Sequence, residues 1–168
     1  MSEENPYATP DADVDVDLNA PGELAGRGRR FGGAMIDGLL MLLFLFPAMF
    51  AVGYWEKAMA QQETVLDIVL VGGIGIAVFL LLNGYLLASS GQTIAKRLLK
   101  MRIVSVQDNR ILPIGKIIAL RYLPFWIVGQ VPFLGQLVGI VNPLFIFGEE
   151  RRCLHDHLAG TKVVMVED

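Results

Sequence analysis

The sequence is short of charge, of cysteine and of the motifs that enzymes use. Asp, Glu, Lys and Arg make up 18% of the 168 residues, below the ~25% of an average soluble domain. A single cysteine, Cys153, excludes an intrachain disulfide and any metal site built on several thiolates. The sequence also lacks a glycine-rich phosphate loop, a nucleophile elbow and a pair of carboxylates spaced for acid–base catalysis. We therefore expect neither an enzyme nor a bound metal or cofactor.

Basic residues are missing from the first part of the chain. Residues 1–23 carry seven acidic residues and no lysine or arginine, so all fourteen basic residues lie after them. Large apolar side chains are also scarce there, and such a segment cannot bury enough surface to offset the entropy lost on ordering. We expect residues 1–24 to form a disordered acidic tail, followed by one membrane domain over residues 25–168.

Apolar residues are abundant, at 54% of the chain, with a mean hydropathy of +0.51. Long apolar runs predict membrane helices at about 30–55 and 65–88. At ~1.5 Å per residue, each run is long enough to cross a ~30 Å hydrocarbon core. We expect Pro47 to kink the first helix and the polar residues 55–64 to form a loop between the two helices.

A third apolar stretch, residues 114–148, is interrupted by prolines and glycines. We expect two helices in it, at about 114–130 and 134–148, joined by a turn. The second helix is short for a complete crossing, so a re-entrant hairpin is the alternative, which needs protein or a water-filled cavity to cover its backbone. Short β segments are expected at about 101–106 and 161–166, where β-branched residues are frequent. The predicted fold class is an all-α polytopic membrane protein: a four-segment helical bundle of two full spans plus a Pro-broken helical hairpin, with a small cytoplasmic β element.

Twelve of the fourteen basic residues fall into three clusters, at residues 27–30, 96–116 and 151–162. Lys57, by contrast, lies in the predicted outer loop. Cytoplasmic loops of membrane proteins are enriched in Lys and Arg. We therefore expect all three clusters and both termini in the cytoplasm, with the helices in a bacterial inner membrane. The clusters would face anionic lipid at the cytoplasmic surface rather than nucleic acid.

Asp37 lies inside the first apolar run, where a carboxylate costs about 2.5–3.5 kcal/mol on insertion scales. Asn83 in the second run and Arg121 in the third lie at a similar depth from the expected cytoplasmic boundary. We therefore predict that Asp37, Asn83 and Arg121 meet in a polar cluster. The cluster is either a ligand or ion site or a structural bridge that fixes helix register, and the sequence leaves both open.

Two histidines flank an acidic residue in the segment His155-Asp156-His157 near the C-terminus. The spacing lacks a third ligand, so we expect no metal there. We interpret the segment as a cytoplasmic turn in which Asp156 accepts hydrogen bonds or pairs with Arg30 or Arg97.

Several short motifs follow one another along the chain. Arg30 and Asp37 lie in the stretch RRFGGAMID, the segment GQTIAKRLLKMRIV contains Gly-x-Thr-x-x-Lys-Arg, and Asp156 lies in LHDHLAGTKVV. Together these motifs resemble the RDD family of bacterial membrane proteins. The resemblance implies that Arg30, Asp37 and Asp156 are the family's motif residues, with Lys96 and Arg97 as supporting residues on the cytoplasmic side.

The resemblance covers about residues 25–166, and Arg121 also fits the pattern. It implies a membrane location, and it implies transport of an unidentified ligand, with cation/proton antiport suggested within the family. We expect a small transporter in which Asp37 binds the ion or proton; its partners would be an ion or small solute and further copies of the chain in a homo-oligomer. The alternative is a non-transporting membrane adaptor or assembly factor whose Arg and Asp pairs are structural.

Overall fold

The computed structural model of the chain describes residues 22–131 and 133–166. Residues 1–21, most of the predicted acidic tail, lie outside the described residues. The end of that tail is ordered, contrary to the prediction of disorder through residue 24. Leu24 forms a β-bridge with Val164, because its extended backbone lies along the last strand and satisfies free peptide groups there.

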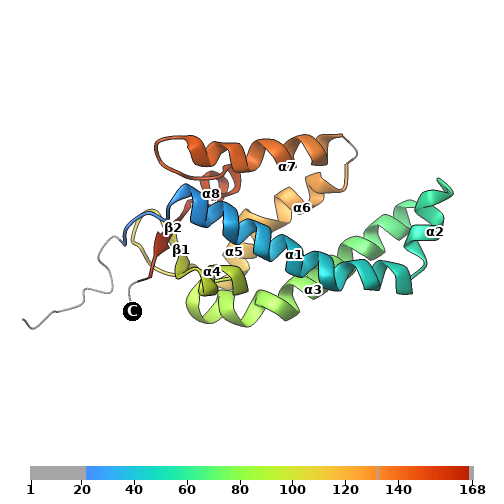
Figure 1. Cartoon of the computed structure of the whole chain (residues 1–168), viewed down its shortest axis with the longest axis horizontal. Coiled ribbons are helices and arrows are strands. Elements are labelled where there is room, and N and C mark those ends of the chain that lie inside the picture. The colour runs from blue at the N-terminus through green and yellow to red at the C-terminus, as the bar shows by residue number, and fades with distance from the viewer. Residues whose placement is uncertain (1–21, 132, 167–168) are drawn as a thin grey trace, which may run out of the picture.

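Two long apolar helices, α1 (Arg27–Ala51) and α3 (Val65–Ser90), run antiparallel and pack against each other (Figure 1). Both are long enough and apolar enough to cross a membrane. They are connected by α2 (Tyr54–Met59), a short helix where we predicted only a loop. The reason is Gly53, whose φ of 67° lets the chain turn directly from one helix into the next.

The apolar faces of α1 and α3 are exposed. In the most apolar window of each helix, none of α1 and 6% of α3 is buried inside the molecule. Large side chains such as Phe31, Leu43 and Leu81 are 62%, 65% and 85% exposed. A water-soluble protein would bury such helices in its core, so these surfaces are suited to lipid, as expected for a membrane protein.

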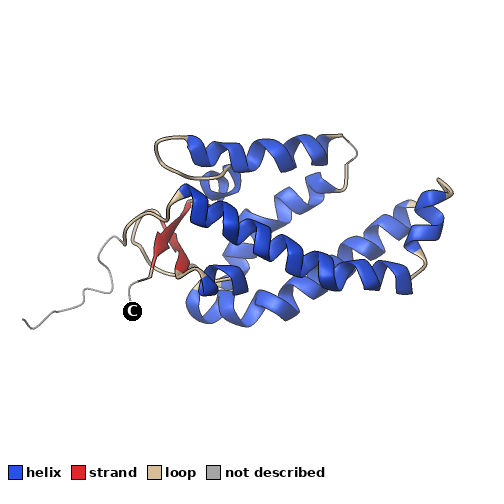
Figure 2. Ribbon diagram, in the orientation of Figure 1, coloured by secondary structure: helices blue, strands red, loops and turns tan. Residues whose placement is uncertain are grey.

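A small folded unit lies at one end of the long helices (Figure 2). Strands β1 (Met101–Ser105) and β2 (Thr161–Met165) pair antiparallel, with Ile103 opposite Val163. Both strands were predicted, and each is one residue shorter than expected. Helices α4 (Ile94–Leu98) and α8 (Leu154–Ala159) each precede one strand. The buried core of this unit contains Met101, Ile103 and Val163, and it extends to Leu87 of α3 and Ile117.

The third apolar stretch folds back on itself (Figure 1). Its first leg consists of α5 (Ile114–Ile117), the π-helical segment η1 (Ile118–Tyr122) and α6 (Leu123–Gly129). Its second leg consists of α7 (Leu134–Leu144) and the 3-10 segment η2 (Phe145–Phe147), and α7 packs against α6. Pro124 has no N–H to donate to the carbonyl four residues earlier, which accounts for the wider π turn just before it.

Candidate functional site

Asp37 of α1 lies beside the first turn of α4. Its Oδ2 accepts a hydrogen bond from the Thr93 hydroxyl at 2.6 Å, and its Oδ1 accepts one from the Ala95 backbone N–H at 3.2 Å. The Lys96 ammonium lies 3.5 Å from Oδ2. The Asp37 side chain is 20% exposed. We call Asp37, Thr93 and Lys96 the Asp37 set.

Asn83 of α3 also binds the first turn of α4. Its Oδ1 accepts a hydrogen bond from the Ile94 backbone N–H at 2.9 Å, and the residue is buried. Thr93 is the N-cap of α4, and its hydroxyl accepts from the Lys96 N–H. Asp37 and Asn83 therefore meet at the first turn of α4, where each satisfies a backbone donor that the helix itself cannot.

Arg121 has other partners, and the predicted single cluster of Asp37, Asn83 and Arg121 is divided into two bonded groups. Arg121 forms an ion pair with Asp156, and its Nη1 donates to the Thr161 hydroxyl at 2.7 Å. The prediction was wrong because similar depth along three helix axes does not determine the direction in which each side chain points. Arg121 turns toward α8 and β2, whereas Asp37 turns toward α4.

Asp156 accepts hydrogen bonds from two arginines, Arg30 of α1 on Oδ2 and Arg121 of η1 on Oδ1. The Cys153 N–H donates to Oδ2 at 3.0 Å, and the Thr161 hydroxyl lies 3.2 Å from Oδ1. The side chains of Arg30, Arg121 and Asp156 are 6%, 2% and 0% exposed. We call these three residues the buried charge network. Of the two arginines considered from the sequence, Arg30 and not Arg97 is the partner in the described structure.

The segment around Asp156 is a helix rather than the predicted turn. Asp156 occupies the third position of α8, where its carboxylate binds the backbone N–H of the N-cap residue Cys153. Such a reciprocal cap stabilises a short helix start. Arg152 adds contacts from the same loop, because its Nη2 donates to the Asp156 carbonyl at 3.1 Å and its Nε to the Thr161 carbonyl at 2.9 Å. The network therefore joins α1, η1, α8 and β2.

Protonation in this region is controlled by burial and by the arginines. Burial raises the pKa of Asp156, but Arg121, His155 and Arg30 outweigh it and hold that pKa well below its usual value. Burial, helped by Arg121, lowers the pKa of His155 to about 3, so this imidazole is neutral at neutral pH. Burial raises the pKa of the Cys153 thiol.

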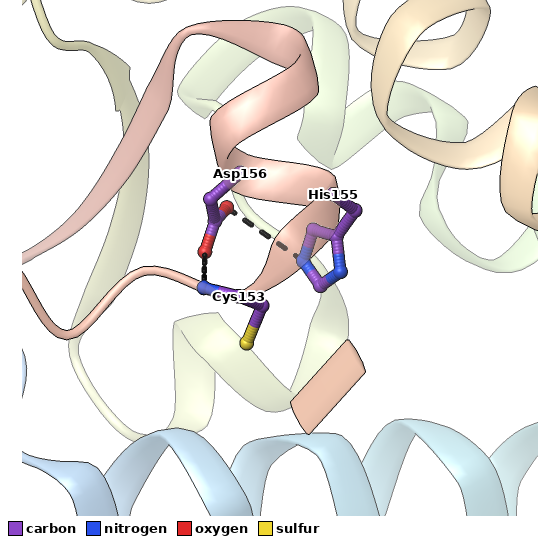
Figure 3. Close-up of side chains that lie close together, drawn as sticks. All are labelled: Cys153, His155 and Asp156. Carbon is purple, nitrogen blue, oxygen red and sulfur yellow. Dashed lines mark hydrogen bonds and ion pairs between the residues drawn. The ribbon is translucent and has the colours of Figure 1, made fainter. Parts of the chain in front are cut away.

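Cys153, His155 and Asp156 lie close together (Figure 3), with potential ligand atoms within 4.8 Å of one another. The Asp156 carboxylate is already engaged by two guanidinium groups, and the Cys153 thiol favours its protonated form. A divalent cation here would be repelled by both arginines at short range. The chemistry of this donor set is thus unfavourable for a metal, and we assign none.

A cavity of about 350 Å³ adjoins the network between α3 and the first leg of the hairpin. The cavity is lined by the aromatic rings of Phe79, Tyr122 and Trp126. Its polar lining includes Arg121 and His155. The close approach of the helices depends on Gly75, because a Cβ there would lie 3.0 Å from the Trp126 ring. His155 Nδ1 lies 2.9 Å from the Asn142 side-chain oxygen, which ties α8 to α7.

Sequence reasoning gave no role to two hydroxyl residues, Thr93 and Thr161, although Thr93 is the Thr of the Gly-x-Thr-x-x-Lys-Arg element. Thr93 directly precedes a helical segment, and a Thr in that position is a recognisable N-cap signal. Thr161 begins a strand and carries no local signal of its own, because its role comes from Arg121 forty positions away. Lys96, expected only as a supporting residue, belongs to the Asp37 set, whereas its neighbour Arg97 is exposed.

A model of the RDD family matches residues 24–160 of the chain. This range extends from the β-bridge at Leu24 through α8. It contains Asp37 and all three residues of the buried charge network. Comparisons with curated proteins and with solved structures gave no match.

Proposed function

The chain belongs to the RDD family, and from that premise we propose that it is a small multi-pass membrane transporter that exchanges a cation or proton at Asp37. The observation that carries the proposal is the difference between the surroundings of two carboxylates, Asp37 and Asp156. Asp37 has a single ammonium group at 3.5 Å and remains partly exposed, whereas Asp156 is fully buried between two guanidinium groups.

Asp156 is unsuited to exchange. Removing or neutralising one member of a buried ion network leaves the others uncompensated in a medium of low dielectric constant, at a cost of about 3–5 kcal/mol. Arg30 and Arg121 would both lose their carboxylate if Asp156 took up a proton or cation. We therefore assign the buried charge network a structural role, with the exchanging group elsewhere.

Asp37 has the features of an exchange site. Its carboxylate and the Thr93 hydroxyl offer oxygen atoms, the ligands that small hard cations prefer. The Lys96 ammonium lies 3.5 Å away, beyond a good hydrogen bond, so an incoming cation competes for the carboxylate against a modest attraction. A proton or metal ion on Asp37 would release Lys96, and departure of that ion would draw Lys96 back.

The proposed topology puts α1 and α3 across a bacterial inner membrane, with both termini in the cytoplasm. Its support is the distribution of charge, because the basic clusters lie at the sheet end and Lys57 lies on α2 at the far end. The two legs of the hairpin, residues 114–129 and 134–147, rise only ~24 Å and ~21 Å. Of the two alternatives for this stretch we favour a re-entrant hairpin over two complete spans, within a four-segment bundle.

The proposed transporter is a homo-oligomer that moves an ion or a small solute. Two crossing helices and a short hairpin enclose little pathway within one chain. The exposed apolar faces of α1 and α3 leave room for contacts with further copies as well as with lipid.

Ion-driven proton flux in everted membrane vesicles tests this proposal. We expect Na⁺, K⁺ or Li⁺ gradients to drive flux with the unaltered chain, and Asp37→Asn to abolish that flux because it removes the exchangeable charge. Asp67→Asn is the matched control, since Asp67 pairs with Lys57 at the opposite end of α3. Equal flux from Asp37→Asn and the unaltered chain, at equal protein level, would contradict the proposal.

A second candidate function is a membrane adaptor or assembly factor, which the pairing of the buried charges with one another favours. In that case the charged residues only stabilise the fold, and the acidic tail binds a partner. Deleting residues 1–21 separates the two functions and spares the pairing of Leu24 with Val164. A transporter should keep its flux after this deletion, whereas an adaptor would retain its fold and lose its partner.

A further inference from the structure

A second cavity, of about 380 Å³, lies between the start of α1 and the end of α7. Four cationic side chains line it: Arg27, Arg30, Lys96 and Arg121. The rest of the wall is largely apolar, and no carboxylate belongs to the wall that the described residues form. A volume of this size is typical of sites for small molecules or headgroups.

The positive charges around this cavity outnumber the carboxylates that balance them. Arg30 and Arg121 share the single carboxylate of Asp156, and Lys96 pairs with Asp37. The partners of Arg27 in the described structure are backbone carbonyls, including Ile146 at 3.3 Å. Two positive charges are therefore left over, and a cavity with this imbalance attracts an anion.

The start of α1 adds to the same potential. Its N-cap is Gly26, and within the described structure no side chain caps this helix end and no acidic residue lies in its first turn. The first turn of this 25-residue helix therefore has free N–H groups and carries the positive end of the helix dipole. This turn adjoins the cavity, because Gly28 is one of the lining residues. Helix starts of this kind bind phosphate and other anions.

The apolar part of the wall continues onto the outer surface. Phe31 of α1, Leu144 of α7 and Phe147 of η2 all line the cavity and are 62%, 54% and 67% exposed. An inorganic anion would match only the cationic part of this wall. A ligand that joins an anionic group to hydrocarbon chains matches both the cationic and the apolar part.

We propose that this cavity binds an anionic phospholipid, with the phosphate group against Arg27 and Lys96 and the acyl chains along Phe31, Leu144 and Phe147. The guanidinium group offers paired N–H donors that match phosphate oxygens. The cavity lies at the first turn of a membrane-length helix, which is the level of the headgroups when the basic end faces the cytoplasm. This lipid site goes beyond the exchange proposed at Asp37 and shares only Lys96 with it.

Native mass spectrometry of the delipidated full chain in detergent tests the lipid site. We expect phosphatidylglycerol to be retained about tenfold more tightly than phosphatidylcholine, and Arg27→Gln to weaken retention about tenfold, the effect of losing one charge-assisted hydrogen bond. Arg29→Gln is the matched control: it removes the same charge two positions away, but Arg29 contacts Met165 and does not line the cavity. Flux at Asp37 should be measurable in both variants, so the two proposals can fail separately.

Ala34→Phe provides a second route, because Ala34 lines the cavity on the exposed side of α1 and a larger side chain fills the space without changing charge. It should reduce phosphatidylglycerol retention as Arg27→Gln does. Equal losses from Arg27→Gln and Arg29→Gln would indicate general surface attraction and overturn the site. Binding of glycerol phosphate or inorganic phosphate as tightly as phosphatidylglycerol would overturn the assignment to a lipid.

Discussion

Asp156 couples distant parts of the chain through one side chain. It binds Arg30, 126 positions earlier, and Arg121, 35 positions earlier, and it caps its own helix through Cys153. Three buried charges are tolerated because each oxygen of the carboxylate has donors on several sides. A group in this position is needed for the fold whether or not the protein transports anything.

Asp156→Asn should therefore lower stability sharply. The substitution keeps the shape of the side chain but removes the only carboxylate in the buried charge network, so Arg30 and Arg121 lose their counter-charge. We expect a loss of about 3–5 kcal/mol, measured as a fall in the thermal unfolding temperature in detergent. The control is Glu150→Gln, which removes an exposed carboxylate paired with Arg152 and should leave the unfolding temperature unchanged. An Asp156→Asn protein as stable as the unaltered chain would contradict a structural role for the network.

His155 gives the fold a dependence on pH. Its pKa is about 3 in the folded chain against an ordinary 6.5, so between these values the unfolded state binds more protons than the folded one. The contribution of His155 to the free energy of unfolding is then complete above pH 6.5 and is lost as pH falls toward 3. The lowered pKa of Asp156 acts in the same direction but only below the usual pKa of a carboxyl.

The measurement is the unfolding temperature between pH 7 and 4.5. We expect it to fall with acidification in the unaltered chain and to fall much less in His155→Gln, which cannot take up a proton but can still bond to Asn142. His157→Gln changes the neighbouring exposed histidine and should keep the full pH dependence. The explanation fails if both variants retain the same slope.

At the scale of elements, the ends of α3 illustrate how local chemistry determines boundaries. Thr64 and Asp67 form a reciprocal cap at its start. Gly91 ends it with a φ of 65°, and the chain then turns at once into α4. A Cβ on Gly91 would lie 2.7 Å from the Ile103 carbonyl oxygen, so both the conformation and the space at this turn require glycine.

Gly91→Ala should destabilise the protein by about 1–2 kcal/mol for the left-handed conformation alone, with more from the contact to Ile103. Because this turn positions α4, the Asp37 set should be disturbed together with stability. Gly115→Ala is the control: Gly115 lies inside α5 with nothing within 4 Å of its Cβ position, and alanine favours a helix there. The thermal unfolding temperature should fall in Gly91→Ala and should stay the same or rise in Gly115→Ala. An equal fall in both variants would contradict this account.

At the scale of the whole molecule, charge and apolar surface are separated along the long helices. The sheet, α4 and α8 gather at one end, and α2 lies at the other (Figure 1). Exposed apolar side chains of α1 and α3 occupy the length between them. A bilayer is the environment that accommodates such a distribution, with polar groups at both surfaces.

Cysteine labelling tests the resulting topology. In a Cys153→Ser background, Glu63→Cys lies in the loop before α3 and Asp108→Cys in the turn after β1, and both positions are exposed. We expect a membrane-impermeant maleimide to label Glu63→Cys in intact spheroplasts and to label Asp108→Cys only after the membrane is opened. Labelling of both from the same side would contradict the two-span arrangement of α1 and α3.

Composition and local pattern were sufficient to predict the two membrane-length helices and the two strands. Such features depend on neighbours within a few positions: apolar runs of membrane length, β-branched segments, and basic residues clustered beside them. The short helix α2 was missed because the conformation of Gly53 decided it rather than any apolar pattern. The helix at Asp156 was missed because its reciprocal cap uses a cysteine in place of the usual Ser or Thr.

The partners of the charged residues were decided only by the tertiary structure. Depth along a helix can be counted from the sequence, but the direction of a side chain depends on how helices rotate and pack against each other. That rotation turns Asp37 toward Thr93 and Lys96, and Arg121 toward Asp156. The sequence by itself determined that this chain carries charge in a membrane-length helix, whereas packing decided which carboxylate is buried between two arginines and which remains partly exposed beside a lysine.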